Sequence, residues 1–292
     1  MPRIIKKEKP EAALKISYQA KEAIVCPVCN AEFHREELLS GSGRLIAGAL
    51  TNELHRLYEP SKKYGRLYPL AYTATVCPQC WFASMEADFT KLPQDKIDKA
   101  IKEEDARRNE ADMICEGVNF NEPRDLHAGI ISQFLVLRCY DYYNASFSPT
   151  IKQAVAAIRT GWMLDDLNAV EPGQNYDWLA TLFKKKARFF YSEALKKEQN
   201  GKETLSAMGN LGPDTDQNYG YEGLLYMNGY LEYTYGDTND PAQRIQNLDE
   251  AKRTLAKMFG MGKSSKSKPG PLMEKSRALY DKFGEALAES DM

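Results

Sequence analysis

Apolar and polar positions alternate over short stretches in the first part of the chain, a pattern that predicts strands separated by turns. Residues 15–20 alternate in this way, residues 23–26 are apolar, and residues 70–77 contain several β-branched and aromatic side chains, which favour pleated surfaces. Glycine and proline interrupt the sequence between these runs. Residues 44–58 fit either a helix or an extended pair of strands. We therefore predict a small β-rich module over residues 1–92.

From Pro93 onward the apolar positions recur at helical spacing. The segment up to residue 116 is highly charged and its apolar residues are too sparse for a deeply buried face, so we expect a solvated helix within a linker over residues 93–122. The remainder, residues 123–292, is predicted to be all helix and turn. The expected helices are residues 123–144, 149–168, 176–199, 219–235, 241–259 and 271–288. The short turn between the first two predicts an antiparallel helical hairpin.

Small and aromatic residues on these helices resemble the spacing of tetratricopeptide repeats. Ala187, Tyr191 and Ala194 have the small-x3-aromatic-x2-small spacing of the second helix of that repeat. The match is degenerate and no clean period of ~34 residues is visible, so a repeat array and an ordinary helical bundle are both compatible with it. The predicted fold class is α+β, with a β-rich N-terminal module followed by an all-α, tetratricopeptide-like region.

Four of the six cysteines occur in two turns of the same form, Cys26-Pro-Val-Cys29 and Cys77-Pro-Gln-Cys80. Two cysteines three positions apart on a tight turn direct both sulfurs to one side, and backbone N–H groups stay free to bond the thiolates. Two such turns supply four sulfurs, a set that suits tetrahedral zinc at Zn–S distances of about 2.3 Å. Because four thiolates leave no position for a bound water, the predicted zinc ion is structural. The apolar runs before the turns would supply the strands of a zinc-ribbon-like unit.

Residues 30–76 separate the two turns, which is longer than the roughly 15–20 residues of compact zinc motifs. The cost of closing a loop grows only with the logarithm of its length, so this insertion leaves the ligand chemistry intact. An iron–sulfur cluster and a redox-active dithiol are the alternatives for the same cysteines. His34 is close enough in sequence to replace one cysteine, although an ordinary surface position is favoured. Cys115 and Cys139 are expected to be packing residues of helices.

The chain resembles a family of bacterial proteins that is numbered 2225 among the domains of unknown function. The specific part of this likeness is the pair of cysteine turns, with Phe33 after the first and the run Tyr72-Thr-Ala-Thr-Val-Cys-Pro-Gln-Cys-Trp-Phe-Ala-Ser84 around the second. The helical run Leu248-Asp-Glu-Ala-Lys-Arg-Thr-Leu255 is similar to the tetratricopeptide-like helices of the same family. The resemblance implies zinc binding and a cytoplasmic bacterial protein, and it implies no reaction. Trp81 departs from the family pattern, in which a small turn residue such as Gly is common at this position.

Composition and charge argue against several classes of protein. Charged residues make up 27% of the chain but the net charge is only −2, which disfavours a surface built to hold phosphate backbones. No apolar run approaches the ~20 residues needed to cross a bilayer, and the basic N-terminus is not followed by the apolar segment of a secretion signal. Six cysteines are too few for a disulfide scaffold, and no common hydrolase motif is present. We expect a cytoplasmic protein with no evident small-molecule substrate.

Two further features have both a structural and a functional interpretation. Tyr226, Tyr230 and Tyr233 recur on one helix face, where packing against a neighbouring helix is favoured over a peptide groove. The segment Gly260-Met-Gly-Lys-Ser-Ser265 resembles the end of a phosphate-binding loop, but it lacks the first glycine of that motif and follows a helix. A basic cluster in and after this segment is more typical of a solvated loop than of a site for RNA or an acidic partner. Its members are Lys263, Lys266, Lys268, Lys275 and Arg277.

These patterns together predict a zinc-binding, non-enzymatic adaptor or scaffold whose helical region binds another, unidentified protein. Its metal ligands would be Cys26, Cys29, Cys77 and Cys80. A nucleic-acid-associated zinc-ribbon protein is the first alternative, and the near-neutral charge disfavours it. A thiol redox protein using the paired cysteines is the second, and it would need an exposed cysteine of low pKa. No membrane partner is expected.

Overall fold

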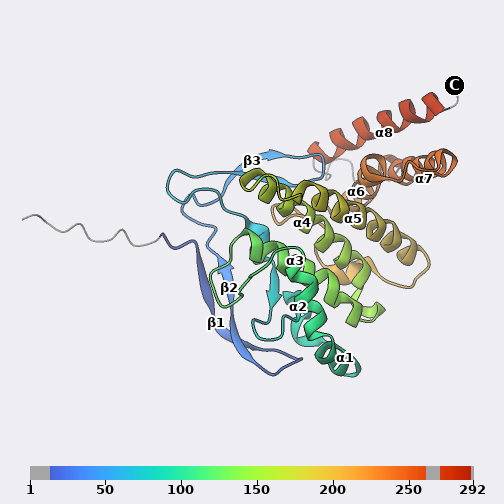
Figure 1. Cartoon of the computed structure of the whole chain (residues 1–292). Helices are drawn as coiled ribbons and strands as arrows, with labels where there is room; N and C mark the ends of the chain where they lie inside the picture. Colours follow the sequence, from blue (N-terminus) through green and yellow to red (C-terminus); the bar gives the residue numbers. More distant parts are fainter. Residues whose placement is uncertain (1–13, 261–269, 291–292) are drawn as a thin grey trace, which may run out of the picture.

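The computed structural model describes residues 14–260 and 270–290 and confirms the α+β fold class (Figure 1). Within these residues the strands form three separate antiparallel pairs. They are β1 (Ser17–Val25) with β2 (Glu32–Leu38), β3 (Ile46–Leu50) with β4 (Arg56–Glu59), and β5 (Ala74–Val76) with β6 (Ala83–Met85). In Figure 1 the pair β1–β2 lies at the lower left, and helices fill the centre and the right.

The strands follow the sequence pattern with two differences, in β1 and before β5. Strand β1 joins the two runs predicted at residues 15–20 and 23–26. Residues 44–58, which fit either a helix or a pair of strands, contain the pair β3–β4. The run at residues 70–77 begins as a 3-10 turn, Pro69–Tyr72, and becomes a strand only at β5. Proline at the first position of that turn fixes φ at a helical value, which explains the late start of the strand.

All six helices predicted in the C-terminal part are present, with ends shifted by a few residues. They are α3 (Leu126–Cys139), α4 (Pro149–Val170), α5 (Tyr176–Gln199), α6 (Gly220–Tyr235), α7 (Pro241–Gly260) and α8 (Gly270–Ser290). Short 3-10 segments lie between the longer elements. They are Glu86–Lys91, Gln94–Lys96, Tyr140–Tyr142, Ala145–Phe147 and Leu205–Met208.

Helices α3 and α4 form the predicted hairpin, and α4 is the central element of the fold. Asp125 begins α3 by accepting a hydrogen bond from the backbone N–H of Ala128 (2.8 Å), which satisfies one of the free donors of the first turn. Pro149 occupies the first turn of α4, as is favourable for proline. Nearly every residue of α4 up to Leu167 is buried, because the helix packs between α3 and α5.

The segment predicted as a solvated linker helix is different in the structure. It forms two short helices, α1 (Ile97–Lys102) and α2 (Glu104–Asp112), which bury one side. Ala100, Arg107 and Ala111 on this side are completely buried. The sequence pattern concealed this face because its largest buried residue is an arginine, and burial of that guanidinium depends on acceptors that come from distant parts of the chain.

A single hydrophobic core extends from the cysteine turns to α8. Buried residues of both β5–β6 and α3 belong to it, as do Leu255 of α7 and Phe283 of α8. The strands β5 and β6 pack directly against α3. The N-terminal strand pairs therefore share their apolar interior with the helices.

The three tyrosines at helical spacing on α6 are used in packing. Tyr226 is buried, donates a hydrogen bond to the carbonyl of Asn52 (2.8 Å) and stacks on Tyr230 with ring centroids 6.0 Å apart. Tyr233 meets Phe283 of α8 edge to face at 5.6 Å. The packing interpretation holds for Tyr226, while Tyr230 and Tyr233 are half-buried and line a pocket together with residues of α8.

Two sequence features lie outside the described residues. They are most of the glycine-lysine segment after Gly260 and the lysines Lys263, Lys266 and Lys268. Among the residues that are described, no helix combines the length and apolar character needed to span a membrane.

Candidate metal centre

Each cysteine turn lies at the tip of a strand pair, and the two tips have the same backbone structure. In the first, the N–H of Cys26 donates to the carbonyl of Ala31 (2.9 Å), and the N–H of Asn30 donates to the carbonyl of Cys26 (3.0 Å). In the second, Cys77 and Trp81 make the equivalent bonds, both at 2.9 Å. This repeated geometry joins β1 to β2 and β5 to β6.

The residue after the second cysteine has a left-handed backbone conformation, with positive φ, in both turns. Asn30 and Trp81 each have φ of 58°. Asparagine tolerates this conformation, whereas a bulky residue adopts it at a cost of roughly 1–2 kcal/mol. Trp81 is held there by its surroundings, because its ring is buried, meets Phe120 edge to face at 5.3 Å and lies under the guanidinium of Arg108 at 4.8 Å. The departure from the family pattern thus preserves the turn geometry.

The four cysteine sulfurs converge on one point. All four lie within 4.8 Å of one another, and the pairs Cys26–Cys80 and Cys29–Cys77 have Sγ–Sγ distances of 3.6 Å. These distances are far longer than the ~2.05 Å of a disulfide. A tetrahedral ion with Zn–S bonds of about 2.3 Å would place its sulfurs ~3.8 Å apart. The cluster could therefore hold a metal ion with little rearrangement.

Burial and mutual contact alter the acidity of these thiols. Cys26, Cys77 and Cys80 are completely buried and Cys29 is partly exposed. Hydrogen bonding to Cys26 and Cys77, followed by burial, raises the pKa of Cys80 far above its ordinary value. Hydrogen bonds from neighbouring thiols and from backbone N–H groups lower the pKa of Cys77. Four thiolates this close need a cation to balance their charge, and a bound metal ion would supply it.

The turns also direct backbone donors at the sulfurs. The N–H of Val28 lies 3.4 Å from the Sγ of Cys26, and N–H groups of Gln79 and Cys80 contribute in the same way to Cys77. Such N–H···S contacts orient metal-binding thiolates and stabilise their negative charge. The proline inside each turn donates no N–H, which leaves the two following residues as the donors.

An aromatic cluster brings the two strand pairs together although residues 30–76 separate their turns. Phe33 follows the first turn, Phe82 follows the second, and both contact Phe89 of the 3-10 segment Glu86–Lys91. The ring centroids are 5.7 Å and 5.3 Å apart, respectively. Phe82 and Phe89 are completely buried. This packing brings the two turns close enough for their sulfurs to meet.

Arg107 of α2 connects the second turn to the helices. Its guanidinium is completely buried and donates to the carbonyl of Cys80 (3.0 Å), the carbonyl of Ala100 (2.5 Å) and the hydroxyl of Tyr142 (3.1 Å). Burial of an arginine is costly unless such acceptors are present. The residue therefore holds the second cysteine turn, α1 and the 3-10 segment Tyr140–Tyr142 in one arrangement.

The other candidate ligands of the sequence lie elsewhere. The ring of His34 contacts the carbonyl of Ala20 through Nδ1 (2.8 Å) on the exposed side of the β1–β2 pair, outside the sulfur cluster. Cys115 and Cys139 are buried in the core, as predicted, and burial raises their pKa values to about 12 and about 11. Cys115 lies in the bend after α2 rather than on a helix. Neither thiol has the low pKa of a redox-active cysteine.

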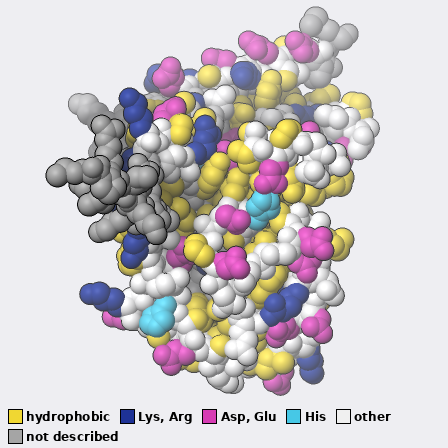
Figure 2. Space-filling model, turned by 60° about the vertical axis from the view of Figure 1, so that its left-hand side comes forward, with side chains coloured by type: hydrophobic (Ala, Val, Ile, Leu, Met, Phe, Trp, Pro, Cys, Tyr) yellow, Lys and Arg dark blue, Asp and Glu magenta, His cyan; other side chains and the backbone are white. Residues whose placement is uncertain are grey.

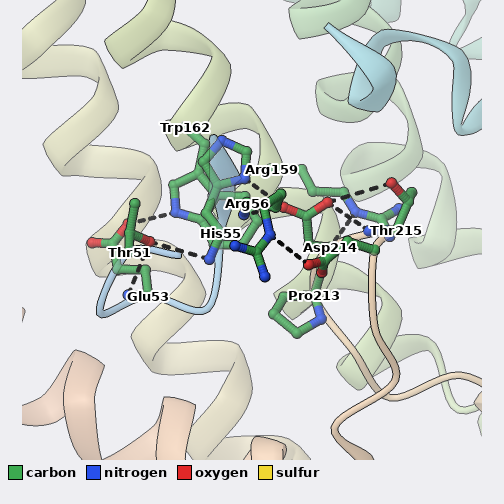
Figure 3. A network of polar contacts seen from close by, with 10 residues as sticks. Thr51, Glu53, His55, Arg56, Arg159, Trp162, Pro213, Asp214 and Thr215 are labelled. Atoms are coloured by element: carbon green, nitrogen blue, oxygen red, sulfur yellow. Dashed lines mark hydrogen bonds and ion pairs between the residues drawn. The ribbon is translucent and has the colours of Figure 1, made fainter. Parts of the chain in front are cut away.

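A second polar constellation centres on Asp214, in the loop before α6 (Figure 3). Its carboxylate accepts hydrogen bonds from Nδ1 of His55 (2.6 Å) and from the backbone N–H groups of Arg56 (2.8 Å) and Thr215 (2.6 Å). Burial alone would raise the pKa of Asp214, but these hydrogen bonds outweigh it and hold that pKa below its usual value. The ring of His55 also stacks on Trp162 of α4, with centroids 4.3 Å apart.

Glu53 extends this network to three helices. Its carboxylate accepts hydrogen bonds from the indole N–H of Trp162 and from the hydroxyl of Tyr235 (2.6 Å), and it lies 3.6 Å from the ammonium group of Lys184. Each carboxylate of the network thus already binds donors of the protein itself. The constellation fastens the turn between β3 and β4 onto α4, α5 and α6, and we interpret it as a structural brace.

Sequence reasoning missed this brace because its members are far apart in the chain. His55 and Asp214 are separated by 159 positions, and Glu53 and Trp162 by 109. No local spacing marks any of them. The only sequence signal was that residues 44–58, which fit either a helix or strands, contain a histidine and a glutamate close together.

Charge on the molecular surface is mixed in the view of Figure 2. Acidic and basic side chains are interspersed over this face, and hydrophobic side chains show between them. Tight binding of a nucleic-acid backbone normally requires a continuous basic surface. The described residues on this face form none.

Comparison with known proteins identifies a family and a similar bacterial protein. Residues 19–283 match the model of DUF2225, which is described as "Uncharacterized protein conserved in bacteria". An uncharacterized protein of Borreliella burgdorferi is 40% identical over 273 residues, which cover 94% of this chain and 98% of that protein. No solved structure matches.

Proposed function

Since the chain belongs to the DUF2225 family of bacterial proteins, whose description states no activity, we propose a function from the structure itself. The protein is a zinc-binding, non-enzymatic adaptor of the bacterial cytoplasm. The two cysteine turns hold one structural zinc ion, and the helical region binds another protein.

The geometry of the sulfurs carries the zinc proposal. Four thiol groups from two turns meet at distances that suit a tetrahedral ion, and three of the four are completely buried. Zinc favours sulfur ligands and this coordination number, and it needs no bridging sulfide. In the proposed site Cys26, Cys29, Cys77 and Cys80 are the four ligands.

A structural rather than catalytic role follows from the ligand number. Four thiolates complete the coordination shell, so the ion would have no open position for water or substrate. The surrounding residues support the same role. Arg107 and the Phe89 cluster connect the turns to the helices, so zinc would stabilise the position of both strand pairs against the helical region.

The adaptor proposal rests on the helical region. Ala187, Tyr191 and Ala194, which have the tetratricopeptide-like spacing, all lie on the buried face of α5. Helices α5, α6, α7 and α8 pack successively, each against the next along the chain. Successive packing of helices creates long surfaces that suit protein binding. We propose that this region is the tetratricopeptide-like part of the molecule.

Metal analysis of matched cysteine variants tests the zinc proposal. Protein purified without added metal should contain about one zinc per chain. Cys77→Ala should lose the metal, whereas Cys139→Ala should keep it, because that thiol is equally buried but lies outside the cluster. Iron together with acid-labile sulfide would support an iron–sulfur cluster instead. A folded, metal-free protein in which Cys26 and Cys29 form a reversible disulfide would support the redox alternative.

A further inference from the structure

Helix α5 exposes three large apolar side chains that are not part of the buried core. Trp178, Leu182 and Phe189 are 61%, 40% and 54% exposed, respectively. The helix already buries a complete face elsewhere, formed by Ala180, Phe183, Ala187, Tyr191 and Ala194. Single exposed apolar residues are ordinary, but several on one face of one helix mark an interaction surface.

The three side chains lie along one side of the helix and form a stripe. At 100° per residue, positions 178, 182 and 189 point within about 40° of one another, and they span ~17 Å of helix. Lys185 falls in the same stripe, between Leu182 and Phe189. This is the spacing at which helices present anchors to a partner, and tryptophan is the residue most often found at the energetic centre of such contacts.

Two lysines beside the stripe are unneutralised, whereas Glu193 at its far end pairs with Lys196 (3.0 Å). The three lysines of the run Lys184-Lys185-Lys186 do not all point the same way. Lys184 turns inward, where it forms ion pairs with Asp165 (2.5 Å) and Glu53 (3.6 Å). Lys185 and Lys186 are exposed, and neither has a carboxylate within 4.0 Å among the described residues. A partner that covers this stripe therefore meets two free ammonium groups.

We propose that the outward face of α5, formed by Trp178, Leu182, Lys185, Lys186 and Phe189, is the docking surface for an acidic, amphipathic segment of a partner protein. This proposal rests on the adaptor function and specifies where the partner binds and what chemistry it has. The aromatic anchors provide affinity through burial, and the lysines select acidic partners and accelerate their association. A membrane is the less favoured occupant, since only three apolar side chains project and two lysines add little attraction to anionic lipid.

Selection from a random peptide library tests the surface while the natural partner is still unidentified. Twelve-residue peptides displayed on mRNA are selected on the full-length, metal-loaded protein. The enriched peptides are then measured against Trp178→Ala, against Lys185→Glu/Lys186→Glu and against Met113→Ala. Met113 is the control because it is also strongly exposed, at 84%, but lies beyond the end of α2. Thermal unfolding of each variant shows that the fold is intact.

We expect the enriched peptides to be acidic and to carry apolar residues at helical spacing. Trp178→Ala should lower the affinity for these peptides at least tenfold, and the double charge reversal should lower it at low salt. Met113→Ala should bind the peptides as the wild type does. No enrichment, basic peptides, or peptides that bind Trp178→Ala unchanged would overturn the proposal. Two other results would also overturn it. One is binding to vesicles that contain phosphatidylserine, and the other is self-association in sedimentation, if either is lost in Trp178→Ala.

A separate measurement distinguishes this inference from the adaptor function. The wild type and Trp178→Ala are each used to isolate partners from bacterial cells, with Met113→Ala as the reference. A protein retained by all three would leave the adaptor function standing and remove α5 as its surface. In the opposite case, the wild type retains no protein beyond those that Cys77→Ala also retains, and yet it binds the selected peptides. That result would count against the adaptor function.

Discussion

Two residues in equivalent positions show how local geometry and packing compete at the metal turns. Asn30 and Trp81 share a left-handed backbone conformation, but only asparagine adopts it readily. The four cysteines of the cluster were predictable from spacing, because the pattern of each turn lies within four consecutive residues. The side chains that hold Trp81 in place were not, since Arg108 and Phe120 come from other segments.

Glycine substitutions at the two positions should have different effects. Asn30→Gly should change the free energy of unfolding by less than about 0.5 kcal/mol, because asparagine pays little strain there. Trp81→Gly relieves the strain but removes a buried ring, so we expect a net loss of about 2–3 kcal/mol. Urea unfolding of both variants measures the difference. Equal or greater stability of Trp81→Gly would mean that the ring contributes less than its burial indicates.

The hydrogen-bonded carboxylate of Asp214 should make the stability of the fold depend on pH. Its pKa in the folded protein lies below its usual value, so its contribution to stability is present above the unfolded pKa of about 3.9 and disappears as pH falls through the folded value. Asp214→Asn should therefore lower stability at pH 7 by about 2–3 kcal/mol, the scale of hydrogen bonds to a charged group. The difference from the wild type should shrink steadily below pH 4. A difference independent of pH would show that the charge of Asp214 is unimportant.

At the scale of elements, the helices were predictable and the way in which strands attach to them was not. Apolar periodicity located α3 to α8 because each buries a long series of apolar residues at helical spacing. The pattern of the segment that forms β3–β4 fits either a helix or strands. Its structure depends on contacts of Glu53 and His55 with Trp162 and Asp214, which are far away in the chain. The buried side of α1 and α2 was missed for a similar reason, because the burial of Arg107 depends on carbonyls outside α2.

The brace at Glu53 should control the β3–β4 pair as a unit. Glu53→Ala leaves the ammonium of Lys184 and the indole N–H of Trp162 without an acceptor, so we expect a loss of about 3–5 kcal/mol in stability. Hydrogen exchange should also become faster over residues 46–59. Glu59→Ala is the matched control, since Glu59 is on the same pair but exposed. Similar exchange rates in both variants would contradict the bracing role.

At the scale of the whole molecule, the shared core makes the strand pairs and the helices depend on one another. The division into residues 1–92, 93–122 and 123–292 stays a prediction about domains. The cysteine turns, Phe89 and α3 nevertheless belong to one apolar interior, which a pattern of local periodicities cannot reveal.

Removal of the metal should therefore affect the entire chain. We expect a strong chelator to lower the melting temperature by ~10 °C or more, with strands and helices unfolding in one transition. The loss follows because the freed thiols lie beside Arg107 and the Phe89 cluster, whose packing depends on the position of both turns. Circular dichroism and tryptophan fluorescence followed together would detect it. Two separate transitions, with the helical one unchanged, would instead support independent domains.

X-ray absorption at the zinc edge, on protein purified without added metal, is the most direct test of the four-thiolate centre. We predict a shell of four sulfur atoms at about 2.3 Å, the arrangement to which the observed Sγ–Sγ distances of 3.6 Å correspond. The spectrum of Cys77→Ala should show no such shell. Nitrogen or oxygen neighbours at about 2.0–2.1 Å in place of sulfur, or protein that contains no zinc, would contradict the proposed centre.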